Sequence, residues 1–368
     1  MNILIFVIIL LILVLVHEFG HFWTAKKFGI RVDEFGFGFP PRLFVIRRGE
    51  TLYSFNLLPI GGFVKIFGDN PDEESVNGID KNRSFVNKPK YKQAIVLLAG
   101  VFANFLLAWL LFSIGFMSGL PTSIGNEPKG YSVTDAHLVV VSVLANSPAE
   151  IAGLKSGDKI IAVQSGKDEI KKDINPDILK SFVISHPNEA IRLSYLRNNL
   201  DEAVKVVTMT PTQNFTDQIP TIGISMDEIG TIKLPVFRAF WEGLKLDWSV
   251  TKNTTLGLYT LIKEGIGGRG SFSSVAGPVG MVGITGDAYQ LGFVYLLSFT
   301  ALISINLAII NLIPFPALDG GRLLFLLIEK IKGSRLNPKF ANIANIVGFT
   351  ILIILMFLVT YHDVVKLF

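Results

Sequence analysis

The sequence contains no cysteine, which limits how the protein can be stabilised and how it can bind a metal. Disulfide bonds and thiolate metal sites are both excluded, so a zinc site would have to use His, Asp or Glu. Histidine is scarce, with 5 in 368 residues, and charged residues make up only 17% of the chain. Because 50% of the residues are hydrophobic, we predict an integral membrane protein with more than one module.

The net charge of +4 does not indicate a nucleic-acid surface. Many Lys and Arg residues flank apolar segments, where they fix topology and meet anionic lipid. We therefore expect the lipid bilayer as a partner and no nucleic acid.

Four segments are predicted to be transmembrane helices, because a hydrocarbon core of about 30 Å needs about 20 helical residues. They are residues 1–25, 93–117, 291–313 and 340–361.

The basic residues between these helices predict the orientation of the chain. Lys and Arg are concentrated in 26–92 and 314–339 and are nearly absent from both termini. The positive-inside rule then makes the two loops cytosolic and both termini external. The long segment 118–290 also faces outward in this topology, as expected for a protein of the inner (cytoplasmic) membrane.

The first apolar segment contains a His-Glu-x-x-His motif, formed by His17, Glu18 and His21. On a helix, the i, i+4 spacing puts both imidazoles on one face, where they can bind Zn²⁺, and the glutamate can act as a base. A chance match and a signal peptide are the alternatives. The first is disfavoured because ionisable groups at membrane depth are costly. The second is disfavoured because no basic segment precedes the apolar run.

A catalytic zinc needs a third protein ligand, and Asp319 is a candidate. It follows the third apolar segment, between Pro314 and Pro316 on one side and Gly320-Gly321 on the other. Prolines break the helix and glycines free the backbone, so a carboxylate could be carried on a kinked segment. The alternative is an aspartate that caps a helix starting at Arg322. Spacing alone does not decide between them.

Three further segments have distinct patterns. Residues 33–68 contain short β-prone runs separated by Gly and Pro, including Gly61-Gly62, and predict hairpins that either dip into the bilayer or rest on it. Residues 127–212 predict a β-rich domain. Residues 213–290 include an amphipathic helix that lies on the membrane surface or packs on the β domain.

Taken together, these motifs resemble the site-2 protease family of zinc intramembrane proteases, and among them the bacterial regulator-of-sigma-E type. The resemblance is carried by His17-Glu18-Phe19-Gly20-His21, by Leu318-Asp319-Gly320, and by Ala99 to Phe105 and Asn306 to Pro314 in two of the helices. Residues 138–163 are similar to the PDZ domain of that group, and 36–67 to its membrane-re-entrant β-loop.

The resemblance implies a polytopic α-helical membrane protein with four transmembrane helices, a re-entrant β-loop and an inserted PDZ domain. It makes Asp319 the third zinc ligand and Glu18 the catalytic base of an endopeptidase. Single-span membrane proteins, such as anti-sigma factors or signal-peptide remnants, would be the substrates. Residues expected to contact them are Asn306, Asn311, Pro314, Gly61 and Gly62.

One departure from the family concerns the outward domain. The best-known members carry two PDZ domains in tandem, whereas this chain has room for one. That domain would bind substrate or filter it by size. A metal transporter and a PDZ scaffold with a vestigial metal site are the rival functions, and the intact Glu18 disfavours the scaffold because binding alone needs no base.

The topology gives a first testable prediction. Reporters inserted at positions 75 and 333 should read cytosolic, and reporters at 170 and after 368 should read external, because the basic loops stay inside. Reporter activity in intact cells is the measurement. An external reading at 75 would invert the orientation.

Overall fold

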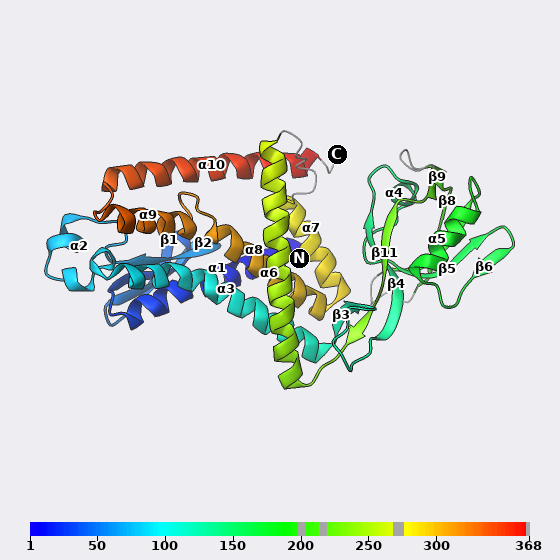
Figure 1. Ribbon diagram of the computed structural model, residues 1–368, viewed down its shortest axis with the longest axis horizontal. Coiled ribbons are helices and arrows are strands. Elements are labelled where there is room, and N and C mark those ends of the chain that lie inside the picture. Colours follow the sequence, from blue (N-terminus) through cyan, green and yellow to red (C-terminus); the bar gives the residue numbers. More distant parts are fainter. Residues whose placement is uncertain (198–202, 214–218, 268–275, 366–368) are drawn as a thin grey trace. The chain divides into compact units, whose positions relative to one another are not determined.

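The computed structural model describes residues 1–197, 203–213, 219–267 and 276–365 (Figure 1). The chain divides into two compact units. The first comprises residues 1–112, 243–286 and 298–368, and the second comprises 113–242 and 287–297.

The first unit is mainly helical and contains one two-stranded sheet. Its elements, some of which continue into the second unit, are α1 (Asn2–Lys27), β1 (Val32–Arg48), β2 (Thr51–Ile66), α2 (Glu73–Asn77), two 3-10 turns (Lys81–Arg83 and Phe85–Asn87), α3 (Lys90–Ser118), α6 (Val236–Ile266), α7 (Pro278–Leu291), α8 (Phe293–Leu312), α9 (Asp319–Lys332) and α10 (Pro338–Val365).

Within the described residues, four helices are long and apolar enough to cross a membrane: α1, α3, α8 and α10. They coincide with the four predicted segments to within a few residues. The prediction of a polytopic helical membrane protein with an inserted β domain is therefore confirmed. Helices α3 and α8 pack through Ala108, Phe112 and Ile305, and Leu246 and Val250 of α6 pack against this cluster.

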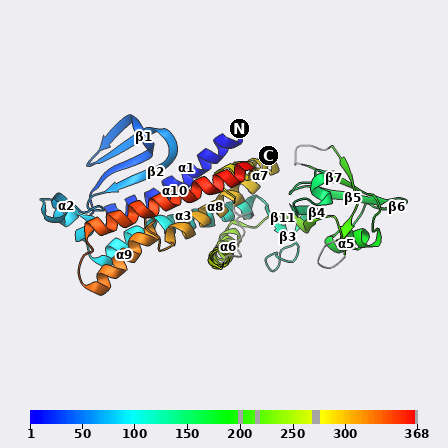
Figure 2. The same cartoon turned by 90° about the horizontal axis from the view of Figure 1, so that it is seen from above.

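The two long strands β1 and β2 bend so that each pairs with the other more than once. Residues 32–37 pair with 62–66 on one side and with 51–55 on the other, and 51–55 also pair with 44–48. The result is a curled sheet with edges at 62–66 and 44–48 (Figure 2). Segment 51–55 is paired on both sides.

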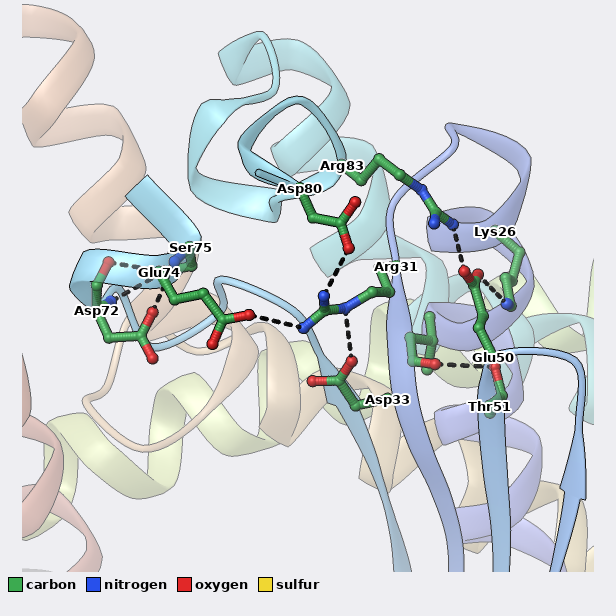
Figure 3. Close-up of polar contacts among 11 residues, drawn as sticks. Lys26, Arg31, Asp33, Glu50, Thr51, Asp72, Glu74, Ser75, Asp80 and Arg83 are labelled. Carbon is green, nitrogen blue, oxygen red and sulfur yellow. Dashed lines mark hydrogen bonds and ion pairs between the residues drawn. The ribbon is translucent and has the colours of Figure 1, made fainter. Parts of the chain in front are cut away.

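Charged side chains fix the base of this sheet to α1 and to the loop that follows β2 (Figure 3). Glu50, in the turn between the strands, accepts from Lys26 of α1 and from Arg83, each at 2.6 Å. Arg31 donates to Asp33 at 2.9 Å and to Asp80 at 2.7 Å. Partly exposed ion pairs of this kind add little stability individually, so their main effect is to fix the position of the sheet relative to α1.

The second unit contains the β domain. Its strands are β3 (Leu120–Ser123), β4 (Thr134–Val143), β5 (Lys159–Ser165), β6 (Asp168–Ile170), β7 (Ile191–Leu196), β8 (Lys205–Met209), β9 (Thr212–Gln213), β10 (Pro220–Thr221) and β11 (Ile224–Ile232), with helices α4 (Pro148–Ile151) and α5 (Pro176–Ser185). Seven of these strands form one sheet, in the order β3-β11-β4-β5-β7-β8 with β6 paired to β5.

The core of this domain lies between the sheet and α5. Val140, Val163, Leu179 and Ile191 are fully buried there. The sheet extends beyond the predicted range 127–212, because β3 and β11 join it from either side of that range. Residues 224–232 therefore belong to the same β domain as 127–212.

Candidate metal centre

Three side chains from distant parts of the sequence meet in the first unit. Nε2 of His17 lies 3.0 Å from Oδ2 of Asp319, and Nε2 of His21 lies 3.2 Å from the same oxygen. The two Nε2 atoms are 3.2 Å apart. In a tetrahedral zinc site with ligands at about 2.0–2.2 Å, neighbouring ligand atoms lie about 3.3–3.6 Å apart. The observed spacing is slightly tighter and fits such a site.

Hydrogen bonding of the imidazoles indicates that this cluster needs a cation. Nδ1 of His21 lies 2.7 Å from the carbonyl oxygen of Val96, which can only accept, so Nδ1 carries the proton. In the neutral imidazole of His21, Nε2 then carries a lone pair that points at the carboxylate of Asp319. This contact is repulsive unless a proton or a metal ion lies between the two groups. Two imidazoles and one carboxylate form a donor set that suits zinc.

Asp319 lies at the start of a helix, directly after a tight turn. It is the first residue of α9, after Leu318, whose side chain makes no cap hydrogen bond. The alternative of an aspartate capping a helix that starts at Arg322 is therefore wrong. Burial alone raises the pKa of the Asp319 carboxyl, but when His17 and His21 are protonated their hydrogen bonds outweigh it and hold that pKa well below its usual range.

The two histidines lie against a glycine of α3. A Cβ atom added at Gly100 would lie 2.3 Å from Nε2 of His21 and 2.9 Å from Cε1 of His17. One turn further along α3, the fully buried Asn104 has its Nδ2 3.4 Å from Nδ1 of His17. Amide orientation is an assignment, so the oxygen of Asn104 can equally face this nitrogen and accept its proton. Contacts of this kind orient metal-binding imidazoles.

A cavity of about 310 Å³ contains the cluster. Glu18 lines it beside the two histidines, and its carboxylate interacts with the backbone of Val64 in β2. The edge segment 62–66 therefore borders the cavity. One side of this segment pairs with 32–37. The opposite side pairs with no strand in the described part of the chain.

The other residues expected to contact substrate are placed differently. Asn311 lines the cavity, and a Cβ at Gly62 would lie 3.9 Å from Cγ of Glu18. Gly61, beside it, has a φ of +89°. Pro314 lines a separate apolar cavity between α3 and α9, and Asn306 is exposed. The roles of these five residues stay predictions.

Sequence reasoning missed two further residues that line the cavity, Asp69 and Arg322. Nη1 of Arg322 donates to both carboxylate oxygens of Asp69, at 2.9 and 2.8 Å. The position of Arg322 one helical turn after Asp319 was a signal that it lies near the site. No local pattern in the sequence pairs it with Asp69.

The contact at Gly100 gives a testable prediction. Gly100→Ala should lower metal affinity roughly tenfold or more, because the added methyl group occupies the space of both imidazole rings. Alanine is otherwise favoured over glycine in a helix, so the loss is not an effect of helix propensity. Metal content of the purified protein after dialysis against a graded chelator series is the measurement.

Gly257→Ala in α6 is the matched control, because a Cβ there meets nothing within 4 Å. This variant should keep its metal. An unchanged metal affinity in Gly100→Ala would show that the histidines do not bind the metal in this arrangement.

Comparisons with known proteins agree with this site. The profile of peptidase family M50 matches residues 5–355. A Clostridium acetobutylicum protein named "Putative zinc metalloprotease" is 35% identical, with 99% of this chain and 97% of the relative covered. The zinc metalloprotease RasP of Geobacillus kaustophilus is 28% identical, with 100% and 98% covered. The regulator of sigma-W protease RasP of Bacillus subtilis is also 28% identical, with 99% and 98% covered.

The family match includes both the His-Glu-x-x-His helix and the segment that carries Asp319. The expected family, enzyme class and cofactor are confirmed. This chain belongs to peptidase family M50 and is a multi-pass zinc intramembrane metalloprotease.

Proposed function

We propose that the enzyme cleaves peptide bonds within the transmembrane segments of single-span membrane proteins, with Glu18 as the general base. The observation that carries this proposal is the position of Glu18. It lines the same cavity as the candidate ligands His17, His21 and Asp319, next to an unpaired strand edge. A base and a place for an extended peptide thus lie within one cavity.

In this mechanism His17 and His21, as neutral imidazoles, and the carboxylate of Asp319 hold the zinc ion. When bound, zinc acts as a Lewis acid that polarises water and the substrate carbonyl. Glu18 takes a proton from the attacking water and later returns it to the leaving amine. Asn311 lines the same cavity, and its side-chain amide would donate to the substrate backbone or to the developing oxyanion.

A transmembrane substrate must be unwound before attack, because helical hydrogen bonds shield its peptide groups. On its cavity side segment 62–66 pairs with no strand among the described residues, and apart from the Val64 group that contacts Glu18 its backbone can pair with an unwound peptide by strand addition. This pairing would return some of the hydrogen bonds that the substrate loses when its helix opens.

The apolar surface of the curled sheet supports its placement at membrane depth. Leu43, Phe44, Ile46, Leu57 and Leu58 are all exposed. Several large apolar side chains exposed on one sheet are unusual in water and favour contact with lipid. With the basic loops in the cytosol and both termini outside, the zinc site would lie near the cytosolic face of the inner membrane.

Substrate identity follows from the membrane location and from the relatives. One relative is named a regulator of sigma-W protease. An anti-sigma factor is therefore one substrate class that we propose, and signal-peptide remnants are another. The β domain of the second unit, as a PDZ domain, would bind such substrates or exclude bulky ones.

The assignment of the base is tested by Glu18→Gln. Cleavage of a reconstituted single-span substrate should fall by at least about 100-fold, because the proton acceptor is lost. Zinc content should not change, since the three ligands remain. Asp319→Ala is the contrasting variant and should lose zinc as well as activity. Full activity in Glu18→Gln with normal zinc would remove the base from the mechanism.

Strand addition is tested by proline, which lacks the backbone N–H and cannot pair in a ladder. Proline introduced at Gly62 and Ile66, two residues to either side of the Val64 group that contacts Glu18, should impair cleavage with zinc content normal. Alanine at Val64 should be mild.

The other edge of the same sheet supplies the control. Proline at Val45 and Ile46 alters an edge strand that pairs only with 51–55 and does not line the cavity. Cleavage should persist in these variants. Equal tolerance of proline at both edges would exclude backbone pairing with 62–66.

A further inference from the structure

A second cavity, of about 600 Å³, lies directly beside the zinc cavity in the first unit. Four residues line both cavities: Asp69, Phe85, Leu97 and Arg322. They therefore form the neck between the two spaces. We call the second cavity the vestibule.

The vestibule has a mainly apolar lining with polar and charged side chains set into it, and it belongs to the segments predicted to be cytosolic. The loop after β2, the end of α9 and the start of α10 surround it. The polar side chains that line it, apart from the neck, are Asn70, Gln93, Glu329, Arg335, Lys339, Asn342 and Asn345. Hydrolysis consumes one water molecule for each bond cleaved, and a space of this volume, with polar groups that can bind water, lies next to a site among apolar helices.

Packed apolar side chains form two sides of the neck, and charged side chains form the other two. Phe85 and Leu97 are 8% and 5% exposed and belong to a packed apolar cluster with Ile30 and Val96. Asp69 lies on the loop after β2, and Arg322 is a long side chain that is 39% exposed. Their ion pair crosses the neck at 2.8–2.9 Å. Neither charged side chain belongs to the apolar cluster, so the ion pair can separate without loosening that packing.

We propose that the Asp69–Arg322 ion pair is a gate between the vestibule and the zinc cavity, and that water reaches the zinc site through it. The role given to the water rests on the proposed proteolytic function. The gate itself does not, because it controls access to the cavity whether or not a peptide is cleaved.

The absence of cysteine allows a direct test with single introduced thiols. Leu307→Cys reports on the zinc cavity, and Asn342→Cys reports on the vestibule. The full chain is placed in lipid nanodiscs, where both faces are accessible, and a negatively charged methanethiosulfonate reagent is added. Labelling rates are measured by mass spectrometry.

We expect the vestibule thiol of Asn342→Cys to be labelled rapidly in every background. The cavity thiol of Leu307→Cys should be labelled slowly when the ion pair is intact and about tenfold faster or more after Asp69→Ala. The reversed pair Asp69→Arg with Arg322→Asp should restore slow labelling, which a loss of folding or a simple change in local charge would not do. Asp72→Ala is the matched control, because this carboxylate lies in the same loop, bonds to Ser75 and lines neither cavity.

An equal labelling rate of the Leu307→Cys thiol with and without Asp69→Ala would overturn the gate. Rapid labelling of this thiol while the ion pair is intact would also overturn it, because the cavity would then be open to water by another route. The same rates are expected in a Glu18→Gln background. If the gate passes this test but the protein with Glu18 intact cleaves no single-span substrate, the proposed function is refuted and the gate stands.

Discussion

The close crossing of α1 and α3 is the contact on which the site depends. A Cβ at Gly20 would lie 2.3 Å from the backbone oxygen of Ala99, so only glycine allows the helices to approach this far. Gly20 lies between the two histidines in sequence, and Gly100 lies against their rings. Small residues commonly permit such approaches in membranes, where packing rather than the hydrophobic effect drives helix association. Here the approach also brings the Val96 carbonyl and Asn104 within reach of the two imidazoles.

The third ligand is placed by an equally tight turn. A Cβ at Gly320 would lie 2.3 Å from the carbonyl oxygens of both Leu312 and Ile313, and one at Gly321 would lie 2.2 Å from that of Phe315. Ala317 adopts a φ of +76°, which is uncommon for a residue with a side chain. The turn is therefore packed on its own carbonyls, and it fixes the direction of Asp319 toward α1. Exact placement of this kind is what a preorganised metal site requires.

The curled sheet adds a different kind of constraint. Its base is fixed to α1 by charged groups, while its edge 62–66 borders the zinc cavity. A rigid base and an unpaired edge are the properties expected of a surface that receives an extended peptide. The neighbouring loop carries Asp69, so the segment that borders the cavity on one side also contributes to the neck on the other. Substrate positioning and access of water are thus connected through a few residues of one chain segment.

The sequence by itself determined the four helices, the inserted β domain and three of the groups at the site. Runs of about 20 apolar residues have few alternatives to a membrane helix, and the i, i+4 spacing places His17 and His21 on one face of any helix. Glu18 and its chemistry follow from the same motif. Asp319 was a candidate from its flanking residues, but spacing left a capping role equally open, and only the family resemblance favoured a ligand.

Tertiary structure decided what depends on contacts between distant residues. The convergence of Asp319 on histidines about 300 positions earlier, the cradle at Gly100 and the Asp69–Arg322 pair leave no periodic signal in the chain. The edge at the cavity is 62–66 because β1 and β2 bend and pair with each other more than once, which a pattern of short apolar runs cannot reveal. Local periodicity reports which face of an element is buried, whereas a site built across elements is fixed only when their backbones pack together.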